Sequence, residues 1–436
     1  MTSAALLDQA VAQYRAGRLD AGLQLAAQAL QQGGGQNAAQ LALLCLAEAN
    51  QLGPVDTLLE IARQHGLPPL DLCRYACTNL MKIGKRGALV TLATGLPQGH
   101  PLRIQAIYHA ACARLLGGEV EAALQEFESF RLQVKDYMGL VPYLASDIYN
   151  VPFRQGVTVL AASGVDRRLA AAEASPPAST DFRLDRPIET AAPICFAVTA
   201  DGRYVERFAP GLVAAFDQPG RALHIHVVNG DERTDALLDR LASGLEHLAL
   251  GISRSEDRRY RTATSYACTR FFVLPALLRA YGRPIVALDI DLLPREALFR
   301  LEEACAEDSF DFACYAMDRH EPASIYQASV MVFAPNTRVL DFLDRLGQFC
   351  LPKLHQPVRV NWLLDQAALI SVLNWQQQRG IAFRFRTLNE VLGGVLADVI
   401  APVASEEEKG SIKASSSGLD GLVDAEGIVT YDWQPD

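Results

Sequence analysis

Several features are absent from this sequence of 436 residues, and each absence excludes a class of protein. No C-x-x-C pair occurs among its nine cysteines, which favours buried thiols in a reducing compartment over a disulfide framework. No apolar run approaches the roughly 18 to 20 residues needed to cross a bilayer. Positive charge is scarce, since 40 Lys and Arg stand against 50 Asp and Glu. We therefore expect a soluble, acidic protein that binds no nucleic acid, has no transmembrane segment and is not secreted, either cytoplasmic or peripheral at the inner membrane face.

The length allows two or three domains, and residues 1–162 predict an all-helical one. Helix–turn–helix phrases recur around Gly17 and Gly118, which are separated by roughly three units of a 34-residue repeat. Intermediate turns are expected near Gly53 and near Gly84 or Gly87. Four helical hairpins fit this spacing.

This half resembles a degenerate tetratricopeptide-repeat array. Such arrays stack helical hairpins into a concave surface that commonly binds peptides or partner subunits. The resemblance implies a protein partner or self-association through this domain. A module that serves only packing or dimerisation fits the pattern equally well.

Residues 163–192 are rich in Pro, Ser and alternating charges, and we expect an exposed linker there. In the remaining segment, residues 193–436, short β-rich runs alternate with helical periodicity. This alternation predicts an α/β domain with a Rossmann-like, mostly parallel sheet, whose ligand site lies at the carboxyl ends of the strands.

The only D-x-D pattern in the chain follows an apolar run that predicts a buried strand, residues 285–288. If the segment is extended, Asp289 and Asp291 face the same side. Two carboxylates in one space suit a hard divalent cation such as Mg²⁺ or Mn²⁺. The alternative is that both acids simply end the strand and begin a turn before Pro294.

With these residues in view, residues 193–375 are similar to nucleotide-sugar-dependent glycosyltransferases of the A-type fold, and most similar to glycosyltransferase family 8. Thr199, Asp201 and Tyr204 match the family's T-x-D-x-x-Y phrase, which implies contacts to the base and ribose of the nucleotide. A turn Asp followed by a packing Tyr explains the same residues without a ligand.

Further matches follow in the family's order. Arg270 matches an arginine that helps to bind the donor, and because apolar residues flank it, it needs an anionic partner if buried. Gln327 lies where the family has an Asn-x-Gly phrase facing the sugar, a departure that leaves the donor sugar open. Asp365 and Gln366 match the D-Q helix start that projects toward the donor sugar, although an Asp there also complements the helix dipole.

One family feature is missing, because the third metal ligand is usually a His near the C-terminus and the last His here is His355. The tail could supply an oxygen ligand instead, or diphosphate and water could fill the position. Residues 403–422 suit a lid over the donor, in which Lys413 would meet the diphosphate; an exposed lysine is the alternative.

The resemblance implies a metal-dependent, retaining glycosyltransferase that uses Mn²⁺ or Mg²⁺ and a nucleoside-diphosphate sugar, a UDP-sugar by preference, with a glycan, lipid or protein acceptor. A non-catalytic repeat adaptor with a degenerate transferase domain is the main alternative. A phosphatase of the haloacid dehalogenase type is the weaker one, because Leu293 stands where those enzymes have Thr or Val.

Overall fold

The computed structural model describes most of the chain, namely residues 1–67, 69–82, 84–116, 122, 123, 125, 162–173, 181–256, 263–307, 310–316, 326–354 and 364–403. The chain divides into two compact units with a boundary near Asn150. No helix among the described residues is both long and apolar enough to cross a membrane.

The described part of the first unit is a series of helices, and helices that follow one another along the chain pack together. Its helices are α1 (Ser3–Arg15), α2 (Leu19–Gln31), α3 (Gly35–Glu48), α4 (Val55–Gln64), α5 (Pro69–Lys82), α6 (Arg86–Gly95) and α7 (Pro101–Leu116). They form because apolar residues recur on one face; in α4, for example, Val55, Leu58, Leu59 and Ala62 are buried.

The expected turns fall between consecutive helices at three positions. Gly17 separates α1 from α2, Gly53 separates α3 from α4, and Gly84 separates α5 from α6, whereas Gly87 lies inside α6. The turn expected near Gly118 lies outside the described residues. The helices are therefore compatible with the predicted array, and its tetratricopeptide character stays a prediction.

The second unit is built on an eight-stranded sheet in the order β1-β4-β3-β2-β5-β8-β7-β9. The strands are β1 (Arg183–Arg186), β2 (Cys195–Asp201), β3 (Ala222–Val228), β4 (Ala249–Ser255), β5 (Ile285–Leu288), β7 (Phe312–Ala316), β8 (Tyr326–Phe333) and β9 (Phe385–Thr387). The central strands β4, β3, β2 and β5 pair in parallel, as expected. Because β8 is antiparallel to both β5 and β7, and β1 is antiparallel to β4, the sheet as a whole is mixed.

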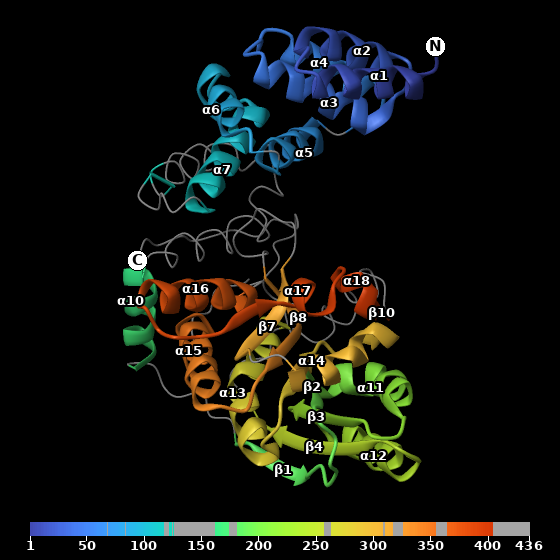
Figure 1. Ribbon diagram of the computed structural model, residues 1–436, viewed down its shortest axis with the longest axis vertical. Coiled ribbons are helices and arrows are strands. Elements are labelled where there is room, and N and C mark those ends of the chain that lie inside the picture. The colour runs from blue at the N-terminus through green and yellow to red at the C-terminus, as the bar shows by residue number, and fades with distance from the viewer. Residues whose placement is uncertain are drawn as a thin grey trace, which may run out of the picture. The chain divides into compact units, whose positions relative to one another are not determined.

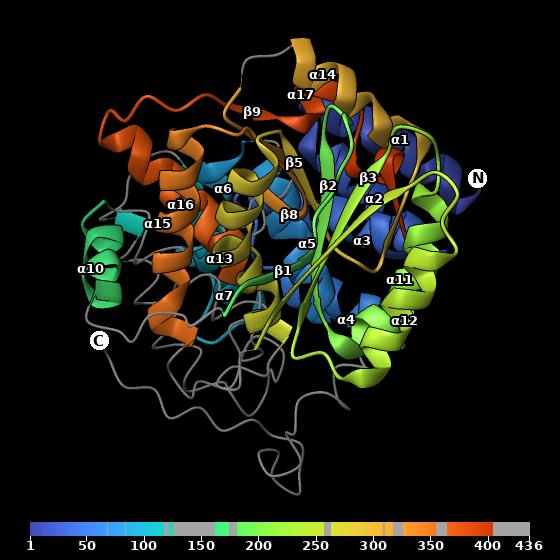
Figure 2. The same cartoon turned by 90° about the horizontal axis from the view of Figure 1, so that it is seen from below.

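Helices cover both faces of this sheet (Figures 1 and 2). The larger ones are α11 (Gly202–Phe216), α12 (Glu232–Ser243), α13 (Ala263–Tyr281), α15 (Thr337–Leu354) and α16 (Leu364–Gln378). Phe196 and Val198 of β2 point into an apolar cluster with α11 and α12, whereas Cys195 and Ala197 point into a second cluster with α13, α15 and α16. Burial on both faces explains why the central strands read as continuous apolar runs.

Smaller elements complete the unit beyond β5. A two-stranded sheet joins β6 (Leu292–Pro294) to β10 (Ile400–Pro402) in antiparallel register. The remaining short helices are η1 (Glu296–Arg300), α14 (Leu301–Glu307), α17 (Leu388–Leu392) and α18 (Leu396–Val399).

Part of the segment expected to be a linker is ordered structure. Helix α10 (Ala162–Glu173) packs against α15 and α16, and β1 adds an edge strand to the sheet. The docking of α10 has a specific cause, because Asp166 accepts a hydrogen bond from the indole of Trp375 at 2.8 Å and Arg168 lies over the ring of Phe349. The α/β unit thus includes elements that composition alone assigned to a connection.

Candidate functional site

The sheet has a topological switch point between β2 and β5. From β2 the chain proceeds through α11 and α12 to β3 and β4 on one side, and then returns through α13 to β5 on the other side. Ligands of open α/β sheets bind at such a point, beside the carboxyl ends of the strands. Asp201 ends β2 and Asp289 directly follows β5, so both lie at this edge.

The two aspartates of the D-x-D pattern do not lie on a continuous strand. Strand β5 ends at Leu288, and Ile290 and Asp291 form a turn that leads into β6. Asp289 donates its N–H to the carbonyl of Ser329 on β8 at 3.2 Å, and the carbonyl of Asp291 accepts from the N–H of Val403 at 3.1 Å. The premise of an extended segment is therefore wrong for these residues, and backbone bonds to β8 and to the segment after β10 hold the turn instead.

Arg270 of α13 is the buried cation of this site, with 6% of its surface exposed. Its Nη2 donates to Asp289 Oδ1 at 2.6 Å, its Nη1 donates to the carbonyl of Ala328 at 2.7 Å, and its Nε donates to the carbonyl of Ala267 at 2.8 Å. Asp289 is thus the anionic partner that a buried arginine requires. Three fixed acceptors leave the guanidinium little freedom to rotate.

The charges of the site influence one another. Burial disfavours the cation of Arg270, but the nearby carboxylates of Asp289 and Asp365 hold its pKa above the usual value. Burial also raises the pKa of Asp365; the cation of Arg270 lowers it in part, and the charge of Asp289 raises it further. Arg270, Asp289 and Asp365 therefore form one electrostatic cluster, drawn from α13, the end of β5 and the start of α16.

The first turn of α16 brings a second pair of polar side chains to this cluster. Asp365 Oδ1 accepts from the backbone N–H of Gln366 at 2.9 Å. Gln366 Oε1 in turn accepts from Gln327 Nε2 of β8 at 3.5 Å. The residues matched to the family's sugar-facing strand and helix are therefore neighbours in space.

The residues expected at the nucleotide have structural contacts of their own. Asp201 is buried and caps α11, because its carboxylate accepts from the N–H of Tyr204 at 3.0 Å, and burial raises its pKa. The ring of Tyr204 packs on Phe208, with centroids 5.3 Å apart. Thr199 of β2 is paired in register with His226 of β3. Their contact with a base or ribose stays a prediction.

No group of three or more His, Cys, Asp or Glu side chains that could hold a metal ion occurs in the part of the chain that the structure describes. Asp289 and Asp291 supply carboxylate oxygens of the kind that Mg²⁺ and Mn²⁺ prefer, so the donor chemistry fits such an ion. His355, Lys413 and the expected lid from 404 onward lie outside the described residues.

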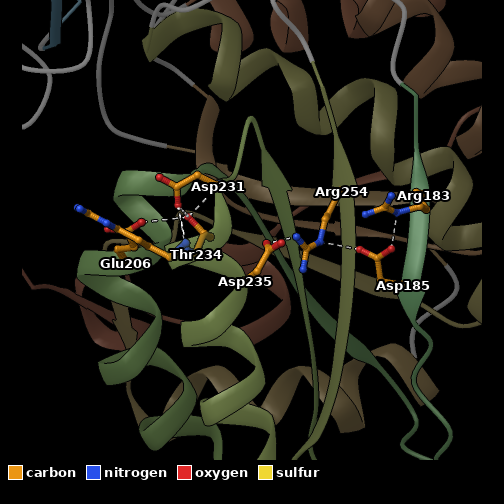
Figure 3. A network of polar contacts seen from close by, with 8 residues as sticks. Arg183, Asp185, Glu206, Asp231, Thr234, Asp235 and Arg254 are labelled. Atoms are coloured by element: carbon orange, nitrogen blue, oxygen red, sulfur yellow. Dashed lines mark hydrogen bonds and ion pairs between the residues drawn. The ribbon is translucent and has the colours of Figure 1, made fainter.

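A polar network at the end of β3 was missed by sequence reasoning (Figure 3). Asp231 caps α12 and accepts from the N–H of Thr234, whose hydroxyl donates to Glu206 of α11, each at 3.0 Å. A Cβ on Gly202 would lie 2.8 Å from the Thr234 hydroxyl, so glycine permits this close approach. The signal for it is the Asn-Gly-Asp run that ends the strand, where Asn229 has a positive φ of 53°.

The same network extends to the edge of the sheet. Arg254 of β4 lies between Asp185 of β1, at 2.7 Å from its Nε, and Asp235 of α12 (Figure 3). These ion pairs attach β1 and α12 to β4.

Comparisons with known proteins give glycosyltransferases as the similar structures. No family model matches the chain, and no curated protein matches it. The chain is similar to the apo structure of the bifunctional glycosyltransferase WbbM, with 13% identity over 42% of this chain and a TM-score of 0.31. It spans 38% of that protein.

Two further similar structures are the galactosyltransferase LgtC in complex with donor and acceptor sugar analogs and a mannosyltransferase from Pyrobaculum calidifontis in complex with GDP-Man and Mn²⁺. The first is 14% identical over 51% of this chain and 96% of that chain, with a TM-score of 0.31. The second is 15% identical over 55% and 67%, with a TM-score of 0.29. Scores of this size carry no functional argument, which has to come from the motifs and the site.

Proposed function

We propose that this protein is a metal-dependent glycosyltransferase that moves a sugar from a nucleoside-diphosphate donor to a hydroxyl acceptor. The observation that carries the proposal is the cluster of Arg270, Asp289 and Asp365 beside the switch point of the sheet. Anionic ligands and sugar hydroxyls need the combination of fixed positive charge and carboxylate acceptors that this cluster offers.

The balance of charge supports a divalent cation. Asp289 and Asp365 bring two carboxylates to the cluster and Arg270 brings one cation, and Asp291 follows Asp289 two residues later. Asp289 and Asp291 would hold Mn²⁺ or Mg²⁺, with the diphosphate, water or residues outside the described part completing the ligands. Such an ion supplies Lewis-acid stabilisation of the leaving diphosphate.

The remaining roles follow from the position of each side chain. Arg270, fixed by three acceptors, keeps a positive charge where negative charge develops on the leaving group. Asp365 would accept a hydrogen bond from a sugar hydroxyl, and Gln366 and Gln327 would contact the sugar beside it. Lys413 would contact the diphosphate.

Recognition of the nucleotide would use the other side of the switch point. Thr199, Asp201 and Tyr204, at the end of β2 and the start of α11, would contact the base and ribose of a UDP-sugar. Retention of the anomeric configuration follows from the resemblance to family 8. The acceptor is a glycan, a lipid or a protein, and the helical unit would bind a protein partner or a second copy of the chain.

The test is binding and hydrolysis of a panel of nucleotide sugars in the presence of Mn²⁺. We expect one of UDP-glucose, UDP-galactose, UDP-N-acetylglucosamine and GDP-mannose to raise the melting temperature and to be hydrolysed slowly without acceptor. Asp291→Asn should abolish the Mn²⁺-dependent part of both effects. Asp344→Asn, which changes a carboxylate on α15 that accepts from Gln348, is the matched control and should change neither.

The outcome also separates the proposal from its rivals. If no nucleotide sugar stabilises the protein and Asp291→Asn equals wild type, the enzyme proposal is wrong and the non-catalytic adaptor is favoured. Release of phosphate from a simple phosphomonoester, lost in Asp289→Asn, would instead favour a phosphatase.

A further inference from the structure

We propose that Gln327 is a positioning residue that turns the amide of Gln366 so that its N–H group faces the donor sugar. This inference rests on the proposed function and adds a determinant of sugar recognition to it. It begins from the contact between the two amides, in which Gln327 Nε2 donates to Gln366 Oε1 at 3.5 Å.

The backbone of β8 is irregular at this point. Cys314 of β7 pairs with Met331, but the next residue, Tyr315, pairs with Gln327, so residues 328–330 have no partner in β7. A bulge of this kind bends a strand and redirects its side chains, and bulges recur beside functional sites. Gln327 is therefore the ladder residue next to the bulge, at the place where β8 passes the charged cluster.

The bulge is fastened to that cluster by its own backbone. The carbonyl of Ala328 accepts from Arg270 at 2.7 Å, and the carbonyl of Ser329 accepts from the N–H of Asp289 at 3.2 Å. Because the residues next to Gln327 are held by the buried arginine and by the D-x-D turn, the origin of its side chain is fixed relative to both. From this fixed origin, the side chain of Gln327 can hold the side chain of Gln366 at the start of α16 in one orientation.

The direction of the contact matters chemically. An amide that accepts through its oxygen presents its N–H₂ group on the other side. Next to it, Asp365 offers a carboxylate that can only accept while it is ionised. A donor and an acceptor side by side suit one sugar hydroxyl, which accepts from Gln366 and donates to Asp365. The site would thus select a donor sugar with an unsubstituted hydroxyl at that position.

The length of the contact sets the size of the effect. A hydrogen bond between neutral groups contributes little net free energy, and a contact of 3.5 Å is at the long and weak end of the range. We therefore expect a change of several-fold in sugar recognition. A merely structural glutamine would change stability and leave sugar recognition as it is.

The test compares binding of each nucleotide sugar with binding of its nucleoside diphosphate, by calorimetry with Mn²⁺. The probes are UDP-glucose, UDP-galactose, UDP-N-acetylglucosamine and GDP-mannose against UDP and GDP. Gln327→Met removes the hydrogen bond and should reduce the ratio of the two affinities about threefold. Gln327→Glu accepts but cannot donate, so it should turn the Gln366 amide around and reduce the ratio about tenfold.

The variant Gln366→Met separates the effect of the Gln366 amide orientation from the effect of the charge that Gln327→Glu adds. In Gln366→Met the change Gln327→Glu should have no further effect on the ratio, because no amide remains to be turned. Gln348→Glu adds the same charge on α15, where Gln348 bonds to Asp344, and should leave the ratio unchanged.

The two proposals fail differently. If wild type binds every nucleotide sugar no more tightly than the matching diphosphate, the glycosyltransferase proposal is overturned together with this one. If wild type prefers a nucleotide sugar and the Gln327 variants keep the full preference, only the positioning role is overturned. The same holds if Gln327→Glu acts equally in the Gln366→Met background, since the cause is then its charge.

Discussion

The two units of the chain differ in how far along the sequence their contacts reach. In the helical unit, neighbouring helices pack on one another, and Gln51 of the turn after α3 bonds back to Asp20 of α2. In the α/β unit, β2 pairs with β5, and Asp166 of α10 bonds to Trp375 of α16. The candidate site lies in the second unit because only long-range pairing brings separate polar groups to one strand edge.

This difference predicts where a single change does most damage. A residue that links distant elements affects several of them, whereas a residue in a local hairpin affects two helices. The three predictions below test this contrast, beginning with the largest effect.

Arg270→Met should lower the free energy of unfolding of the α/β unit by about 3 kcal/mol, measured by urea unfolding. The change removes the partner of Asp289 and leaves the carbonyl of Ala328 without its donor. Arg279→Met, at an exposed position of the same helix, is the control and should change stability by less than about 0.5 kcal/mol. Equal effects of the two changes would mean that the buried ion pair does not link these elements.

Arg270 also shows what sequence reasoning can reach. Its apolar neighbours indicate burial, and burial of a cation demands an anion, so a partner was predictable. The identity of that partner was not, because Asp289 reaches Arg270 only through the pairing of β5 with β8 and the bulge in β8. Residue chemistry thus predicts the need for a contact, and topology selects the residue that fulfils it.

The segment expected to be a linker shows the converse case, because part of it forms α10 and β1. The sequence of β1 is polar and charged, which resembles an exposed connection, yet Asp185 on this strand pairs with Arg254 of β4. Likewise, α10 has a modest apolar face, and its docking depends on Trp375 and Phe349, far along the chain. Local composition cannot reveal a strand or helix whose stability comes from distant partners.

Buried polar groups of β3 and β4 form a chain of hydrogen-bond contacts that begins at Tyr281. The phenol of Tyr281 contacts His224 Nδ1 at 2.7 Å, His224 Nε2 contacts Ser253 at 2.7 Å, and Ser253 contacts His226 Nδ1 at 2.7 Å. Ser255 ends the chain at His226 Nε2. The ring of Phe182 stacks on that of His226. Burial lowers the pKa of both imidazoles, to about 3 for His226.

These two buried histidines predict that the α/β unit loses stability in acid. An unfolded histidine binds a proton near pH 6.5, whereas folded His226 does so only near 3. Between these values the unfolded state binds more protons, so stability falls as the pH falls. For His226 we expect a loss of about 2 kcal/mol between pH 7 and pH 5 in urea unfolding.

His226→Gln provides the control for this prediction. Glutamine can still bond to Ser253 and Ser255 but does not titrate, so the variant should lose about 2 kcal/mol less than wild type over the same interval. Parallel pH profiles for the two proteins would show that His226 is not the titrating group.

The smallest effect is expected in the helical unit, at the turn between α1 and α2. Gly17 has φ = +73° with nothing within 4 Å of the place a Cβ would occupy, so a substitution there meets backbone strain and no steric clash. Gly17→Ala should therefore cost about 1 kcal/mol. Gly53→Ala, in the turn between α3 and α4, also has open space but no positive φ, so it should cost less.

Because the strain is confined to one hairpin, thermal unfolding of the α/β unit and any nucleotide-sugar binding should stay unchanged. A loss of binding in Gly17→Ala would show that the helical unit supports the site, and that its contacts are less local than its fold indicates.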